Sequence, residues 1–140
     1  MDKILTFYLC ENQYGIDIKL VKEINRKIRY TPVPGAPPHI VGLFNMRGQV
    51  VTLFDLARML GYEDFSKKSN PTCIILKNRE QRPDFVGFLV DKLGDVRDVS
   101  PEECEMLPVN GDQLQDRYLK EIIKTERQLI MAIDPDRIFV

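Results

Sequence analysis

Apolar and β-favouring side chains near the start of the chain are arranged as in two neighbouring strands. They fill positions 4–9 almost without a break, and apolar side chains then alternate with Gly15 and Asp17 over positions 14–18. An alternation with a period of two is typical of a half-buried strand. With Glu11-Asn12 as the turn between the two runs, the pattern predicts an opening β-hairpin.

Positions 19–28 fit two structures. Their apolar residues lie at helical spacing, but Val21 to Ile24 also suits an extended segment, so a short turn of helix and an irregular strand end both stay open. Prolines follow at positions 32, 34, 37 and 38. Each proline lacks an N–H and biases the preceding residue toward extended geometry, which predicts a stiff, irregular crossing.

A second hairpin and the clearest helix come next. Two apolar runs, 40–46 and 49–54, are joined at Arg47-Gly48, where Gly48 can take the positive φ of a tight turn. Asp55 then suits the N-cap of a helix of about two turns, because the apolar side chains that follow share one face and Gly61 stands past its end.

The second half of the chain repeats the strand pattern. The polar segments 78–84 and 108–115 predict loops. Strands are predicted at 72–77, 85–91, 93–99, 118–125 and 128–133. Nine or ten short strands against one clear helix favour an all-β barrel or sandwich, and the helix midway along the chain suggests two strand clusters.

Composition narrows the class of protein. The 140 residues carry 20 Lys or Arg and 21 Asp or Glu, a formal charge of −1, so a strongly basic surface for a phosphate backbone is not expected. The uncharged apolar run at 4–10 is far too short to span a bilayer and is not part of a secretory signal. Three cysteines without a Cys-x-x-Cys pair suit reduced thiols, so we expect a single compact cytoplasmic unit without direct membrane insertion.

Residues suited to catalysis are sparse. His39 is the only histidine and has no Ser or Cys motif beside it, and the eight glycines form no phosphate-binding loop. Turn capping explains the carboxylates of Asp95-x-x-Asp98 and Asp134-Pro135-Asp136 better than a calcium loop does. By elimination the sequence favours binding over turnover, with a hydrolase that depends on His39 or Cys104 as the catalytic alternative.

One basic run leaves a second class of binding open. Its members are Lys19, Lys22, Arg26, Lys27 and Arg29. Such a run is most often a solvated face, but on a small β-barrel it also suits an oligonucleotide. That alternative predicts association that weakens with salt and is lost when these charges are neutralised. Trp is absent and no aromatic residues are interleaved with the run for base stacking, which disfavours it.

Several segments, taken in order, resemble the CheW-type coupling proteins. The likeness is most specific at the turn over 45–48, which reads Asn-x-Arg-Gly between two apolar runs. It covers essentially the whole chain, through segments 5–9, 14–18, 21–24, 32–34, 42–51, 54–56, 86–93 and 95–96. Two positions depart from the family pattern, because Thr52 stands where Pro is usual and Glu121 where Gly is frequent.

The resemblance implies two intertwined five-stranded SH3-like β-barrel subdomains with one short helix, in a single all-β domain over 1–140. It also implies a non-catalytic cytoplasmic adaptor with no cofactor or metal, recruited to membrane-associated receptor arrays. The expected partners are the cytoplasmic tip of a methyl-accepting chemoreceptor and the regulatory domain of a chemotaxis histidine kinase, and no nucleic acid. A CheW-like module of another chemosensory-type pathway is the alternative within the same fold.

Carried over by motif, the resemblance places Arg47, Glu23 and Val21 at or near the receptor-binding groove. Two roles suit Arg47. It either anchors a receptor carboxylate or helix C-terminus, or braces its own turn by bonding a carbonyl of its own chain. Glu23 is alternatively a solvated residue paired with Lys19 or Lys27 at helical spacing.

Apolar positions complete the implied groove. Ile18, Val21, Cys73 and Leu93 match family positions that line it, and core packing is the alternative for each. A groove that accepts a receptor helix uses apolar side chains for burial and a few charges for register.

Overall fold

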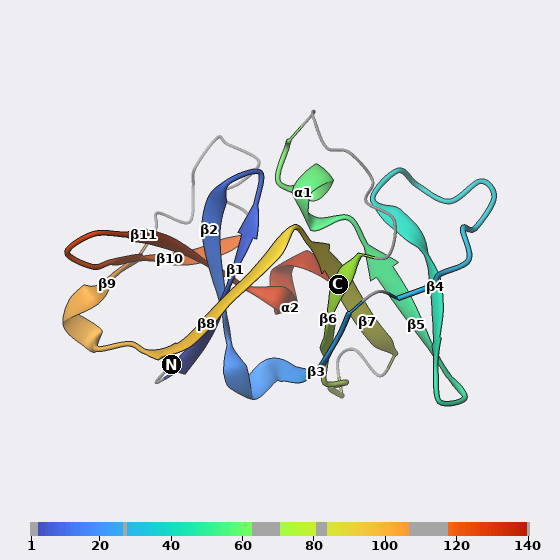
Figure 1. Cartoon of the computed structure of the whole chain (residues 1–140), viewed down its shortest axis with the longest axis horizontal. Helices are drawn as coiled ribbons and strands as arrows, with labels where there is room; N and C mark the ends of the chain where they lie inside the picture. The colour runs from blue at the N-terminus through green and yellow to red at the C-terminus, as the bar shows by residue number, and fades with distance from the viewer. Residues whose placement is uncertain (1–2, 27, 63–70, 81–83, 107–117, 140) are drawn as a thin grey trace. The chain divides into compact units, whose positions relative to one another are not determined.

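The computed structural model describes residues 3–26, 28–62, 71–80, 84–106 and 118–139. The chain forms two compact units: unit 1 is Met1–Leu20 with Lys92–Val140, and unit 2 is Val21–Asp91. In Figure 1 the chain leaves unit 1 after its first hairpin, completes unit 2 and then returns. Each unit holds one β-sheet and the helices are short, which confirms the all-β class.

Unit 1 contains one sheet of six strands. They are β1 (Lys3–Leu9), β2 (Asn12–Asp17), β8 (Lys92–Asp98), β9 (Cys104–Met106), β10 (Leu119–Lys124) and β11 (Leu129–Ile133). Their order is β8-β1-β2-β11-β10-β9, and only β2 and β11 pair in parallel. The resemblance implied five strands, and the described sheet has six, of which the shortest is β9, three residues at the sheet edge that pair with β10. A core cluster combines Ile4, Val99, Ile123, Ile130 and Ala132.

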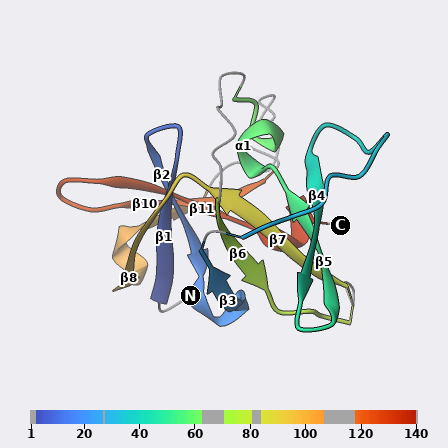
Figure 2. The same ribbon diagram turned by 45° about the vertical axis from the view of Figure 1, so that its right-hand side comes forward.

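Unit 2 contains a sheet of five strands, as implied. They are β3 (Val21–Asn25), β4 (Ile40–Met46), β5 (Gln49–Phe54), β6 (Thr72–Leu76) and β7 (Phe85–Val90). The order is β3-β6-β7-β5-β4, which can be followed in Figure 2, and only β5 and β7 pair in parallel. One core cluster of this unit combines Ile28, Val41, Met46, Val51, Leu53, Cys73 and Ile75.

Two contacts join the ends of the unit 2 sheet. Past β3, the N–H and C=O of Thr31 exchange two hydrogen bonds of 2.8 Å with Leu43 on β4. Gly42 permits this approach, because a Cβ there would lie 2.4 Å from the Thr31 carbonyl oxygen. The second contact is an ion pair between Glu23 on β3 and Arg47, which follows β4. A sheet joined at both ends is curled toward a barrel, consistent with the SH3-like fold that the resemblance implied.

The two predicted hairpins form, and the turn of the first lies one residue earlier than predicted. The second has the predicted bounds, and its turn residues Arg47 and Gly48 have φ of 51° and 86°. In the first hairpin the turn is Cys10-Glu11, with φ of 48° and 71°, one residue earlier than predicted. Positive φ at both turn residues matches the right-handed twist of the flanking strands. The ambiguous stretch after it contains both alternatives in sequence, a 3₁₀ turn η1 (Ile18–Leu20) and then β3.

In the described ranges, each helix is a single turn. The predicted helix is α1 (Leu56–Met59), one turn long, whose first-turn Arg58 N–H donates to the Asp55 carboxylate at 3.1 Å. Two further turns were not predicted, η2 (Pro101–Glu103) and α2 (Pro135–Ile138). Asp134 caps α2 by accepting from Asp136 N–H at 3.1 Å, which is the capping role expected for that carboxylate. Within the described part of the chain, no helix has the length and apolar character needed to cross a membrane.

Candidate functional site

Two residues expected in the receptor groove contact each other in unit 2. Arg47 donates to both carboxylate oxygens of Glu23, from Nη2 at 2.6 Å and from Nη1 at 3.5 Å. The Arg47 side chain remains 71% exposed while that of Glu23 is 24% exposed. The guanidinium therefore contacts Glu23 through one edge, and its remaining N–H donors are accessible to solvent.

The partner of each residue differs from the alternatives that the sequence suggested. In one of its two expected roles Arg47 would brace its turn through a carbonyl of its own chain, but its guanidinium reaches across to the carboxylate on β3. Glu23 was alternatively expected to pair with Lys19 or Lys27; its partner is Arg47, and Lys27 lies outside the described residues. Helical spacing does not apply to Glu23, because its segment is a strand.

The β4–β5 turn explains how Arg47 is presented. The Asn45 side-chain oxygen accepts from Gly48 N–H at 2.9 Å, which closes the turn from within the Asn-x-Arg-Gly motif. Arg47 and Gly48 both have positive φ, so the side chain of Arg47 leaves the tip of the hairpin. This local motif is the signal by which the sequence located the residue.

An extra residue in β3 positions Glu23. Val21 pairs with Leu76 and Glu23 with Ile75, so two steps along β3 correspond to one along β6. This is a β-bulge, which bends a strand and re-aims its side chains. Because Leu76 and Ile75 point to opposite faces of β6, Val21 and Glu23 also lie on opposite faces, although alternate residues of a regular strand share one. Val21 is half-buried.

Cys73 has the second of its two expected roles. It is fully buried in the unit 2 core, where a Cβ on Gly87 would lie 2.8 Å from its sulfur. Burial raises the pKa of its thiol to about 12, against an opposing hydrogen bond from the Phe88 backbone. Because no partner can reach a buried thiol, the groove assignment is corrected for this residue.

The last two expected groove residues, Ile18 and Leu93, belong to unit 1. Ile18 begins η1 and is partly exposed, and Leu93 lies on β8 opposite Phe7 and is also partly exposed. Both therefore have surface to offer a partner.

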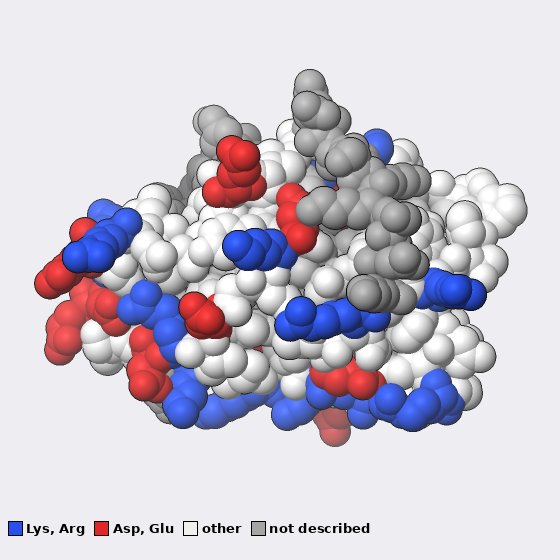
Figure 3. All heavy atoms as spheres, viewed as in Figure 1, with Lys and Arg blue, Asp and Glu red and all other residues white. Residues whose placement is uncertain are grey.

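Exposed apolar side chains on unit 2 were missed by the sequence reasoning. Val50 is 59% exposed on β5, and Leu43 and Val33 are each 38% exposed. Figure 3 shows the surface over the β4–β5 hairpin and the segment before it as largely uncharged. Leu43 and Val50 belong to the two continuous apolar runs at 40–46 and 49–54, but a run without alternation does not show which of its side chains are exposed. Thr52 lies on β5 between β4 and β7, an interior position where Pro would remove a ladder donor.

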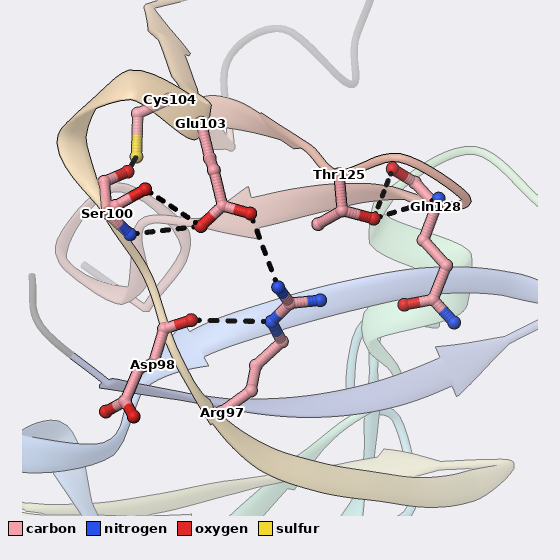
Figure 4. A network of polar contacts seen from close by, with 7 residues as sticks. All are labelled: Arg97, Asp98, Ser100, Glu103, Cys104, Thr125 and Gln128. Carbon is pink, nitrogen blue, oxygen red and sulfur yellow. Dashed lines mark hydrogen bonds and ion pairs between the residues drawn. The ribbon is translucent and has the colours of Figure 1, made fainter.

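Unit 1 carries a polar network around η2 (Figure 4). The Glu103 carboxylate accepts from the backbone N–H and the hydroxyl of Ser100, both at 3.1 Å, and from Arg97 at 3.4 Å. The Ser100 bonds are the main cause that lowers the pKa of Glu103. Lys124 pairs with Glu105 at 2.5 Å, and Figure 3 shows acidic and basic side chains intermixed over η2 and β9. These charges are satisfied within the unit.

The residues named for the alternative functions have structural roles. Burial and the nearby Glu121 and Glu103 carboxylates raise the pKa of Cys104, which disfavours the thiolate that a nucleophile needs. His39 stacks on Phe54 with 6.0 Å between ring centroids. Within the described ranges, no three His, Cys, Asp or Glu side chains gather to hold a metal ion.

The basic run is divided between the two units. Lys19 belongs to unit 1, and Lys22, Arg26 and Arg29 belong to unit 2. Lys22 is the extra residue of the β3 bulge, and its ammonium lies 5.3 Å from the centroid of the Phe85 ring.

The chain is similar to known proteins over nearly its full length. The sequence model of the family described as CheW-like domain matches residues 3–140. The chemotaxis protein CheW of Bacillus subtilis is 30% identical, with 98% of this chain and 86% of that protein covered. The chemotaxis protein CheW of Thermotoga maritima is 26% identical over 97% of this chain and 86% of that protein. The crystal structure of the scaffolding protein TtCheW from Thermoanaerobacter tengcongensis superposes with a TM-score of 0.84, at 27% identity, over 95% of this chain and 88% of that one.

Proposed function

The chain belongs to the CheW-like domain family, and from that premise we propose that it couples chemoreceptors to a histidine kinase as a non-catalytic adaptor of chemotaxis signalling. One partner is the cytoplasmic tip of a methyl-accepting chemoreceptor, and the other is the regulatory domain of the chemotaxis kinase. The protein works in the cytoplasm, where it is recruited to membrane-associated receptor arrays.

One observation carries the proposal: the likeness to CheW proteins extends over both units, not over a single barrel. A structure that covers 95% of this chain at a TM-score of 0.84 is that of a scaffolding protein. An adaptor needs two binding surfaces, and a chain with two β-sheet units provides the area for them. The alternative pathway within the family keeps this architecture and changes only the partners.

Arg47 is the residue that we assign to the receptor. Its guanidinium is held on one side by Glu23 and is otherwise exposed, so it can donate charge-assisted hydrogen bonds to a receptor carboxylate or to the last carbonyls of a receptor helix. Glu23 orients it. The pre-formed pair reduces the side-chain entropy that binding would otherwise cost.

The partly exposed apolar residues Val21, Ile18 and Leu93 supply burial in the proposed contacts. All three are only partly exposed, so each contact buries a small area. Interfaces below about 1,200 Å² are weak and reversible, which suits a signalling adaptor. Many copies acting together in an array raise the overall affinity without any new contact.

Titration of the purified protein with two soluble partners tests the proposal. One is a receptor-tip helical hairpin, and the other is the kinase regulatory domain. We expect saturable binding of each, with dissociation constants on the order of micromolar, and a joint complex when both are present. Failure of both at concentrations of about several hundred micromolar would reject this pathway and direct attention to receptors of other chemosensory systems.

A further inference from the structure

The pairing of β1 with β8 in unit 1 contains a bulge. Leu5 lies opposite Val96, and Phe7 lies opposite Leu93, so Thr6 alone is opposed by the two residues Gly94 and Asp95. An extra residue in one strand leaves backbone groups without their regular ladder partners. Those groups need other hydrogen bonds.

The Thr6 side chain supplies these bonds. Its hydroxyl donates to the Asp95 carbonyl oxygen at 3.0 Å and accepts from Asp95 N–H at 2.8 Å. Thr6 is only 1% exposed, and a Cβ on Gly94 would lie 2.1 Å from the hydroxyl oxygen. The bulge is therefore built from three matched parts: a hydroxyl on β1, a residue without a side chain on β8, and the backbone of Asp95.

The bulge changes which residues of β8 share a face. Residues three apart in a regular strand point to opposite faces. Here Leu93 and Val96 lie opposite Phe7 and Leu5, which share one face of β1, so Leu93 and Val96 share that face as well. Val96 is 53% exposed and Leu93 is partly exposed. The result is a pair of apolar side chains on one face of β8, the last strand at one end of the unit 1 sheet.

We propose that Thr6 is a positioning residue for receptor binding: its hydroxyl holds the Gly94–Asp95 bulge, and the bulge presents Leu93 and Val96 together to the receptor tip. The inference rests on the proposed function, in which Leu93 contacts the receptor. It adds Val96 to the receptor contact. It also means that Thr6, which is buried and touches no partner, determines the positions of Leu93 and Val96.

The test compares Thr6→Val with Thr6→Ser. Valine keeps the shape and loses the hydroxyl, and serine keeps the hydroxyl. We expect Thr6→Val to weaken binding of the receptor-tip hairpin about tenfold, and Thr6→Ser to bind within about twofold of wild type. NMR should show the Phe7–Leu93 and Leu5–Val96 cross-strand contacts in wild type and Thr6→Ser, and the loss of at least one in Thr6→Val.

Thr125→Val is the matched control. The Thr125 hydroxyl also bonds a backbone N–H and C=O in unit 1, those of Gln128, at 3.0 and 3.3 Å (Figure 4). Its loss should leave receptor affinity unchanged. If Thr6→Val does not fold, Val96→Ser tests the presented surface directly, because Val96 is exposed, and it should weaken binding about fivefold.

Leu93→Ser distinguishes the receptor contact at Leu93 from the positioning role of Thr6. If Leu93→Ser binds the receptor tip as wild type does, the receptor contact at Leu93 is wrong and the positioning role falls with it. If Leu93→Ser weakens binding while Thr6→Val retains both its affinity and the cross-strand contacts, only the positioning role is overturned. A loss confined to the kinase regulatory domain would overturn the receptor as the occupant of this edge.

Discussion

Arg47 and Glu23 join the two ends of the unit 2 sheet through a two-point ion pair. Glu23 lies on β3 at one end of the sheet, and Arg47 lies in the turn that follows β4 at the other end. The same ends are bridged by the backbone of Thr31 and Leu43. Arg47 and Glu23, which we assign to receptor binding, thus also help to close the barrel. The proposed receptor contact therefore lies where β3 and the β4–β5 turn meet.

Reversing the charge of Arg47 tests its assigned role. Arg47→Glu removes the donors and places two carboxylates together, so receptor-tip affinity should fall by at least about 1.5 kcal/mol, measured by calorimetric titration. The fold should persist, because an ion pair this exposed contributes about 1 kcal/mol or less to stability. Circular dichroism and a thermal melt check that point.

Arg127→Glu is the control for that experiment, since it makes the same charge change at an exposed position of unit 1 between β10 and β11. It should bind the receptor tip as wild type does. A variant of Arg47 that unfolds would instead assign the residue to bracing the barrel.

Closure of the unit 2 sheet depends on the absence of a side chain at Gly42. Gly42→Ala should lower the free energy of unfolding by about 2–3 kcal/mol, because its methyl group would overlap the Thr31 carbonyl, which is backbone and cannot rotate away. Urea denaturation measures the change. Gly35→Ala is the comparison, since Gly35 has a φ of 77° and open space around it, and should cost only about 1 kcal/mol. If Gly42→Ala and Gly35→Ala lower the free energy of unfolding equally, the Thr31 backbone moves to make room for the added methyl group.

The buried thiol of Cys73 predicts a pH dependence. Burial raises its pKa from the ordinary value of 9.0 to about 12 in the folded protein. The folded state therefore holds the proton that the unfolded state releases, so this contribution to stability is complete below pH 9.0 and is lost as pH rises toward about 12. Between about pH 8 and about pH 10, wild type should lose about 1.4 kcal/mol more unfolding free energy than Cys73→Ala. Parallel losses in the two proteins would contradict the burial of the thiol.

The first hairpin turn holds two non-glycine residues at positive φ. Glu11 has a φ of 71°, a conformation that glycine adopts without a steric penalty. Glu11→Gly should therefore raise the free energy of unfolding by roughly 1 kcal/mol, read from the urea midpoint at unchanged slope. Gly48→Ala, the opposite exchange at a φ of 86°, should lower it by a similar amount. A loss of stability in Glu11→Gly would mean that its side chain contributes more than the backbone strain costs.

Local signals explain which elements the sequence predicted. The bounds of β4 and β5 follow from the Asn-x-Arg-Gly turn, and the start of α1 follows from Asp55, because turns and caps depend on neighbours a few residues apart. The first turn was placed one residue late because Cys10-Glu11 lacks the residue types that favour positive φ. The cap of η2 was readable in Ser100 and Glu103, three residues apart, but was overlooked.

The candidate site was predictable in its residues but not in their contacts. The resemblance named Arg47 and Glu23, and only the structure joined them, because their pairing spans separate elements and needs the bulge in β3. Cys73 was misplaced because an apolar residue of a strand buried on both faces has the same sequence pattern as one that lines a groove. Thr6 gave no signal, since its partner Asp95 is 89 residues away in sequence.

The insertion of all of unit 2 between the two parts of unit 1 makes the order of folding matter. On the ribosome, every strand of unit 2 emerges before β8, the first strand that can return to β1. Closing an unstructured loop of about 70 residues carries an entropic cost on the order of 4 kcal/mol, and much of it falls on unit 1 if unit 2 is unfolded. Folded unit 2 replaces that loop with an ordered connection. A substitution that unfolds unit 2 should therefore also lower the stability of unit 1, because unit 1 must then close the unstructured loop.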